Sequence, residues 1–142
     1  MLLVEDDDFE IISFHRCIGR RNLPIELQRA RNAVEAFEML RMQQAEGRSE
    51  NMLIVLDLNM PSMTGIEFLT ELRADSELRN SVVIAFTSSS DPVDVRRAYE
   101  HNVAAYITKE VDEDSTVKLV DFIECYLRTV TMPLRGLESS PA

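Results

Sequence analysis

Short apolar runs alternate along the chain with longer stretches in which apolar residues recur every three or four positions. The short runs lie at residues 1–4, 25–27, 52–56, 82–86 and 104–107. Runs of this length that are rich in branched aliphatic residues favour β-strands, and the spacing between them favours helices. The pattern therefore predicts five repeats of a strand followed by a helix.

The predicted helices have clear starting signals. Three of them share the capping-box pattern, a capping residue followed three positions later by a glutamate, at Asp7–Glu10, Asn32–Glu35 and Thr64–Glu67. Asp91 precedes Pro92, which suits a cap followed by proline at the first helical position. The fifth helix is expected to begin near residues 112–115.

Alternating strands and helices predict an α/β fold in which a parallel sheet carries helices on both faces. The runs at 52–56 and 82–86 are apolar throughout, so we expect them to be central strands. In such open sheets the ligand site lies beyond the carboxyl ends of the strands. The four glycines are scattered and form no phosphate-binding loop, which argues against a nucleotide site.

Composition narrows the class of protein. The 142 residues suit one domain with a core, and no run is long enough to cross a membrane. Several acids follow the first short apolar run, and this pattern is unlike a signal peptide. Cys17 and Cys125 lie far apart in the sequence, which suits reduced thiols in a cytoplasmic protein. The net charge of −10 argues against nucleic acid and anionic membranes as partners.

Asp57 is the first candidate for chemistry, because it ends a run that looks fully buried. A buried carboxylate is costly unless it is paired or binds a metal. Polar residues also follow the other strands, so we expect them at the same edge of the sheet; they are Glu5-Asp6-Asp7, Asp57-Leu58-Asn59, Thr87-Ser88-Ser89 and Thr108-Lys109.

These strand-end residues together predict a site for phosphoryl chemistry. Clustered carboxylates favour a bound cation, and an oxygen-rich site of this kind suits Mg²⁺. Asp57 could then act as a nucleophile toward a phosphoryl group. The Lys109 ammonium and the Thr87 hydroxyl would contact the phosphoryl oxygens. Each residue alone has a simpler interpretation, as a cap, a turn residue or a surface lysine, and it is the joint pattern that favours a site.

Four motifs of the chain resemble those of the receiver domain of two-component response regulators. They are LLVEDD, VLDLNMPSMTG, AFTSSS and YITK, and the resemblance covers roughly residues 1–128. It implies the flavodoxin-like doubly wound (βα)5 fold with strand order 2-1-3-4-5. It also implies a phospho-accepting signalling switch rather than an enzyme.

The resemblance implies a role for each residue of the site. Asp57 would accept a phosphoryl group from the phosphohistidine of a sensor histidine kinase. Asp6 and Asp57 would bind Mg²⁺ directly, Glu5 mostly through water, and Asn59 through its main-chain carbonyl.

The remaining implied roles concern the switch. Lys109 would bind the phosphate, Thr87 would be the switch hydroxyl and Tyr106 the switch aromatic. Phosphorylation would then shift the surface formed by the fourth helix, fifth strand and fifth helix between two states.

A narrower resemblance lies at residues 126–133, which read YLRTVTMP. This segment is similar to the end of the single-domain response regulators that serve bacterial and cyanobacterial phytochromes. It implies a phytochrome-type kinase as partner and the absence of an output domain, with residues 1–130 as the receiver domain and 131–142 as a partly disordered tail.

Two features depart from the receiver pattern. Glu110 follows the lysine where the family usually has a proline with a cis peptide bond. Because a cis bond before another residue costs about 2.5–4 kcal/mol, we predict a trans bond and a rearranged loop at 109–111. The first predicted strand also starts at the first residue, where receivers usually carry a few more, which leaves the true N-terminus open.

The fifth helix is apolar over about 220° of its circumference between residues 117 and 130, about twice what one buried face needs. We interpret the excess as a homodimer surface along the fourth helix, fifth strand and fifth helix, to which residues 132–134 of the tail could add. The alternative is that the tail covers it. The candidate dimer residues are Leu119, Phe122, Ile123, Tyr126, Leu127 and Val130.

Two other functions stay open on the sequence. One is an adaptor that binds its partner without phosphorylation, which the intact acidic cluster and Lys109 argue against. The other is an aspartate-nucleophile phosphatase resembling the haloacid dehalogenase family. That chemistry needs a second aspartate two positions after the first, and position 59 is asparagine.

Overall fold

The computed structural model describes residues 1–47, 52–60, 63–110 and 114–133. Within these ranges, five parallel strands form one sheet in the order β2-β1-β3-β4-β5, as the resemblance implied. The strands are β1 (Leu2–Val4), β2 (Gln28–Ala30), β3 (Ile54–Leu56), β4 (Val83–Thr87) and β5 (Ala105–Thr108). The helices are α1 (Asp8–Arg21), α2 (Ala33–Ala45), α3 (Gly65–Ala74), α4 (Pro92–Glu100) and α5 (Asp114–Thr129).

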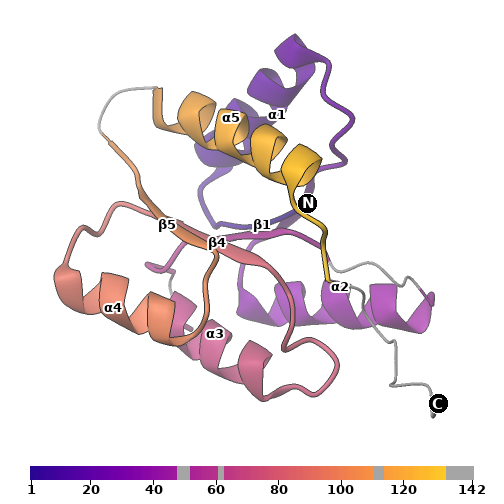
Figure 1. Cartoon of the computed structure of the whole chain (residues 1–142), viewed down its shortest axis with the longest axis vertical. Coiled ribbons are helices and arrows are strands. Elements are labelled where there is room, and N and C mark those ends of the chain that lie inside the picture. The colour runs from indigo at the N-terminus through magenta and orange to yellow at the C-terminus, as the bar shows by residue number, and fades with distance from the viewer. Residues whose placement is uncertain (48–51, 61–62, 111–113, 134–142) are drawn as a thin grey trace.

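Helices cover both faces of the sheet (Figure 1). Helices α1 and α5 lie on one face, and α2, α3 and α4 lie on the other. Each face has its own apolar core. Phe14, Phe86 and Leu119 belong to the α1–α5 side, whereas Leu40 and Phe68 belong to the opposite side. The alternation of side chains along the strands thus supplies two cores and leaves the strand ends for polar residues.

The predicted position of the second strand is wrong by three residues. Residues 25–27 precede the strand, and Gln28–Ala30 pair with β1 instead. Ile25 and Leu27 still pack against the α1–α5 core. The apolar character of Ile25 and Leu27 reflects partial burial of their side chains and not strand pairing. Strand β2 can itself be polar because it lies at the edge of the sheet. The bounds of the other strands differ from the predicted runs by one or two residues.

The predicted helix starts are confirmed, although only one of the three predicted capping boxes forms completely. Thr64 and Glu67 exchange both hydrogen bonds at the start of α3. Asp7, Asn32 and Asp91 cap α1, α2 and α4 with their side chains. The amide of Asp7 donates to Glu5 Oε1 rather than to Glu10, so the predicted box at residues 7–10 does not form.

The Lys109–Glu110 peptide bond is trans, as predicted, since no cis bond occurs in the described ranges. The Glu110 amide donates to Ser115 Oγ at 2.7 Å, which ties the end of β5 to the first turn of α5. The rest of the loop predicted to rearrange lies outside the described residues. None of the helices that the structure describes is both long and apolar enough to span a membrane.

The six candidate dimer residues on α5 differ in burial, and Tyr126 is half-buried. Leu119 and Ile123 are fully buried in the α1–α5 core, so their assignment to a dimer surface is wrong. Phe122, Leu127 and Val130 are 37–38% exposed. Met132 packs against the same core of its own chain, and Leu134 lies outside the described residues. Part of the apolar width of α5 is therefore explained by the sheet, and the outer part remains exposed.

Gly65 allows α3 to approach the segment that carries Asp57. A Cβ atom at Gly65 would lie 2.5 Å from Leu58 Cα and 3.0 Å from the Asp57 carbonyl oxygen. Both neighbours are backbone atoms, which cannot move aside as a flexible side chain would. The Gly65 amide also donates to the Leu58 carbonyl at 3.0 Å, so a hydrogen bond holds the two segments together in addition to their packing.

We predict that Gly65→Ala lowers the free energy of unfolding by about 1–3 kcal/mol, because the added methyl group overpacks this contact. Urea unfolding followed by circular dichroism measures the change. Gly19→Ala is the matched control, since a Cβ at this exposed position in α1 meets nothing within 4 Å. It should raise stability by about 0.5–1 kcal/mol, and equal effects of the two substitutions would contradict the prediction.

Candidate functional site

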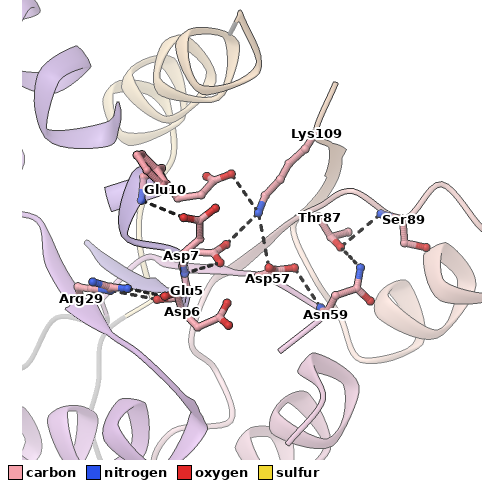
Figure 2. Close-up of polar contacts among 11 residues, drawn as sticks. Glu5, Asp6, Asp7, Glu10, Arg29, Asp57, Asn59, Thr87, Ser89 and Lys109 are labelled. Carbon is pink, nitrogen blue, oxygen red and sulfur yellow. Dashed lines mark hydrogen bonds and ion pairs between the residues drawn. The ribbon is translucent and has the colours of Figure 1, made fainter. Parts of the chain in front are cut away.

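Four strands bring their polar ends to one edge of the sheet (Figure 2). Glu5 and Asp6 follow β1, Asp57 follows β3, and Thr87 ends β4. Glu5 and Asp57 are buried, whereas Asp6 is exposed. Ligand oxygens of these three acids lie within 4.8 Å of one another. The structure therefore brings together the acidic residues that the sequence suggested.

Lys109, which follows β5, places its ammonium among the carboxylates. Its Nζ lies 2.8 Å from Glu5 Oε2, 3.2 Å from Glu10 Oε1 and 3.5 Å from Asp57 Oδ2. It also lies 5.2 Å from the centre of the Phe86 ring, a cation–π distance. Lys109 is thus tied to β1, β3 and α1 at once.

Burial and charge oppose each other at this cluster. Burial raises the pKa of Glu5 to about 7, although the neighbouring Lys109 ammonium works in the opposite direction. For Lys109, burial lowers the pKa, but contacts with Glu5, Asp57 and Glu10 outweigh it and leave the pKa raised. Lys109 therefore stays protonated. At Glu5, the effect of burial outweighs the effect of the Lys109 charge, so the pKa of Glu5 stays raised.

The donor set fits a hard divalent cation. Lys109 brings one positive charge to Glu5, Glu10 and Asp57, and Asp6 adds a further carboxylate beside them. Carboxylate oxygens that converge in this way are the ligands that Mg²⁺ uses, together with water. Glu5, Asp6 and Asp57 are the residues that would hold it.

A chain of hydrogen bonds links Asp57 to Thr87. The Asn59 amide donates to Asp57 Oδ1 at 3.0 Å, and Asn59 Nδ2 donates to Thr87 Oγ1 at 3.1 Å. Thr87 is fully buried, and its hydroxyl oxygen also accepts from the Ser89 amide at 3.5 Å. Asn59 therefore joins Asp57, through its backbone amide, to the Thr87 hydroxyl, through a side chain for which no role was predicted. The predicted metal contact of its carbonyl stays a prediction.

Tyr106 lies on β5 and contacts the segment that follows Thr87. Its hydroxyl donates to the Ser89 carbonyl at 2.7 Å, and its amide donates to the Tyr99 hydroxyl at 3.2 Å. Burial raises the pKa of the Tyr106 phenol. The Tyr106 hydroxyl is therefore tied to the loop after β4, and the Tyr106 backbone is tied to helix α4.

Sequence reasoning missed two residues of the site. Glu10 was assigned to a capping box, yet it contacts Lys109, and its Oε2 is buried with no hydrogen-bond partner among the described residues. Arg29 was assigned no role, yet its guanidinium contacts the loop that carries Glu5 and Asp6. An acid one helical turn after a cluster of acids was the available signal for Glu10. The signal for Arg29 was weaker, a lone cation in a polar edge strand.

A groove of about 820 Å³ opens beside Lys109 between α1 and the start of α5. Glu10, Lys109 and Phe86 form its end at the acidic cluster. Arg16 and Arg20 on α1 line it farther out. The groove next to Lys109 is thus lined by both basic and acidic side chains.

Comparison with known proteins supports the resemblance to receiver domains. Residues 1–121 match the response regulator receiver domain family. The chain is 33% identical over 138 residues to the response regulator Rcp1 of Synechocystis, covering 94% of this chain and 92% of that protein. It is 29% identical over 126 residues to the probable methanogenesis regulatory protein FilR2 of Methanothrix harundinacea, covering 89% and 81%.

Solved structures agree with these relatives. The phosphorylated cyanobacterial phytochrome response regulator RcpA aligns with a TM-score of 0.80 at 32% identity, over 93% of this chain and 96% of that one. The Mn²⁺-bound form of Rcp1 aligns with a TM-score of 0.80 at 33% identity, with the same coverage. In fold, motifs and site geometry, the chain belongs to the response regulator receiver domain family.

Proposed function

We propose that the protein accepts a phosphoryl group on Asp57 from a sensor histidine kinase, in a Mg²⁺-dependent reaction. The observation that carries this proposal is the geometry around Asp57. Its carboxylate lies 3.5 Å from the Lys109 ammonium and within 4.8 Å of ligand oxygens of Glu5 and Asp6. A carboxylate so placed can receive a phosphoryl group whose oxygens meet positive charge on arrival.

In the proposed step, a carboxylate oxygen of Asp57 attacks the phosphorus of a phosphohistidine. A P–O bond forms while the P–N bond breaks, and the electron pair of the P–N bond stays on the leaving nitrogen. Because the other ring nitrogen of the phosphohistidine carries a proton, the ring leaves as neutral imidazole. Lys109 would move from its carboxylate partners toward a phosphoryl oxygen. A bound Mg²⁺ would supply further positive charge for the same oxygens.

The switch is proposed to run through Thr87 and Tyr106. A phosphoryl oxygen on Asp57 would compete for the Thr87 hydroxyl, which now accepts hydrogen bonds from Asn59 and Ser89. Movement of Thr87 would change the position of Ser89, whose carbonyl holds the Tyr106 hydroxyl. Because Tyr106 also contacts Tyr99 of α4, the signal would reach the α4–β5–α5 surface.

We also propose a phytochrome-type kinase as donor and a homodimer as the assembled form. The first rests on the likeness to RcpA, whose description is that of a cyanobacterial phytochrome response regulator. The second rests on the outer face of α5, where Phe122, Leu127 and Val130 are exposed and the Phe122 and Tyr126 rings contact each other in a tilted arrangement with centres 5.8 Å apart. An apolar face of this kind favours contact with another protein surface.

Acetyl phosphate with Mg²⁺ is predicted to phosphorylate the wild type and not Asp57→Asn, because an amide nitrogen is a poor nucleophile. Intact-protein mass spectrometry measures the added phosphoryl group. Asp121→Asn on α5 is the matched control and should be labelled like the wild type. Labelling that survives in Asp57→Asn would rule out Asp57 as the acceptor.

Phosphotransfer from a panel of autophosphorylated histidine kinases is predicted to be fastest from a phytochrome-type kinase. We expect kcat/KM to exceed that of the other kinases by at least about tenfold, which corresponds to about 1.4 kcal/mol in transition-state binding. Loss of radiolabel from each kinase over time measures it. Equal rates across the panel would reject the phytochrome assignment and leave the acceptor role intact.

Light scattering at micromolar concentration is predicted to give the mass of a dimer. Leu127→Asp should shift the mass toward the monomer, since it places a charge on the outer face of α5. Val34→Asp is the control, because Val34 is 63% exposed on the distant helix α2. A wild-type protein that runs as a clean monomer would contradict the dimer.

A further inference from the structure

The acidic loop after β1 is held from the far edge of the sheet by Arg29. This residue lies on β2, and its side chain is only 15% exposed. Its Nε donates to the Glu5 carbonyl at 3.1 Å, and one terminal nitrogen donates to the Asp6 carbonyl at 2.9 Å. The other terminal nitrogen pairs with Asp8 Oδ1 at 2.5 Å. Figure 2 shows the guanidinium against the backbone of this loop.

These contacts bear directly on the carboxylates at the metal position. The two carbonyls that Arg29 binds belong to Glu5 and Asp6, the residues whose side chains offer ligand oxygens. Holding both carbonyls fixes two consecutive peptide planes. The orientation of these planes sets the directions in which the two side chains leave the backbone. The planar guanidinium suits this task because its donors are arranged in a rigid fork.

Other bonds in the loop hold only part of it. The Glu5 amide donates to the Ala30 carbonyl at 3.0 Å, which continues the pairing of β1 with β2. The Asp7 amide donates to Glu5 Oε1 at 3.1 Å. Neither bond fixes the Asp6 carbonyl, which makes its bond with Arg29. The bond from Arg29 therefore helps to fix the direction of the Asp6 side chain.

We propose that Arg29 is a positioning residue for the Mg²⁺ site, which it serves by holding the backbone of Glu5 and Asp6. The proposal rests on the proposed function in so far as that function assigns Mg²⁺ to these acids. Arg29 is not itself a ligand, because a guanidinium carries donors and no acceptor.

Electrostatics and positioning predict opposite effects when Arg29 is removed. A guanidinium beside a cation site repels the cation, so loss of its charge alone should strengthen Mg²⁺ binding. Loss of the two carbonyl contacts should weaken binding, because Glu5 and Asp6 would no longer be held in the orientation that binding needs. The sign of the change therefore separates the two roles.

The test is Mg²⁺ affinity, measured by isothermal titration calorimetry on the full chain without a phosphoryl donor. We expect Arg29→Gln to weaken Mg²⁺ binding about tenfold, the usual scale for loss of a group that orients a metal ligand. Arg29→Lys keeps the charge and loses the fork, so it should also bind more weakly than the wild type. Arg96→Gln on α4 removes the same charge at an exposed position and should leave the affinity unchanged.

The outcomes separate this proposal from the proposed function. If the wild type binds Mg²⁺ and Arg29→Gln binds equally or more tightly, the positioning role is overturned and the metal site stands. If Arg29→Lys matches the wild type, the fork is unnecessary and the proposal is also overturned. If the wild type itself binds no Mg²⁺, both the metal site and this proposal fail. Thermal melting in EDTA checks that each variant is folded, and Arg29→Lys decides the matter if Arg29→Gln is not.

Discussion

The contact between the Lys109 ammonium and the buried carboxylates is the interaction on which the site depends. Glu5 is almost fully buried and Asp57 nearly so, and burying a carboxylate is costly unless a cation lies nearby. Lys109 contacts both, although the three residues come from strands β1, β3 and β5, which are far apart in sequence. The contact therefore requires the parallel order of the strands and a common level for their carboxyl ends.

The two edge strands of the sheet act on the same acidic loop from opposite sides. Strand β2 supplies Arg29, which binds the Glu5 carbonyl, and the end of β5 supplies Lys109, which binds the Glu5 carboxylate. One cation thus holds the backbone of Glu5 while the other balances its side chain. Because Lys109 has a flexible stem and Arg29 a rigid fork, the first can exchange partners and the second is suited to stay in place.

Most of the fold could be predicted from the chain because its signals were local. Apolar runs and capping residues gave five strand–helix repeats, and the strand-end residues gave the acidic cluster. The errors arose where an apolar pattern indicates that a side chain is buried but does not indicate what it pairs with or packs against. Ile25 and Leu27 are buried but precede the strand, and Leu119 and Ile123 face the sheet although they belong to a wide apolar arc. Arg29 was missed because it contacts Glu5 and Asp6 through their backbone carbonyls, and contacts with backbone leave no pattern in a sequence.

The balance of charge in the pocket gives a physical reason for coupling the metal to the phosphoryl group. An aspartyl phosphate at position 57 would carry about one negative charge more than the carboxylate it replaces, in a pocket where Glu5, Glu10 and Asp57 already contact one lysine and Asp6 lies beside two of these acids. Arrival of the phosphoryl group alone would increase that surplus and oppose its own transfer. A divalent cation bound beside the phosphoryl group would reverse the sign of the change. On the proposed function, Lys109 could then turn from Glu5 toward the phosphoryl oxygens without leaving the Glu5 carboxylate unbalanced.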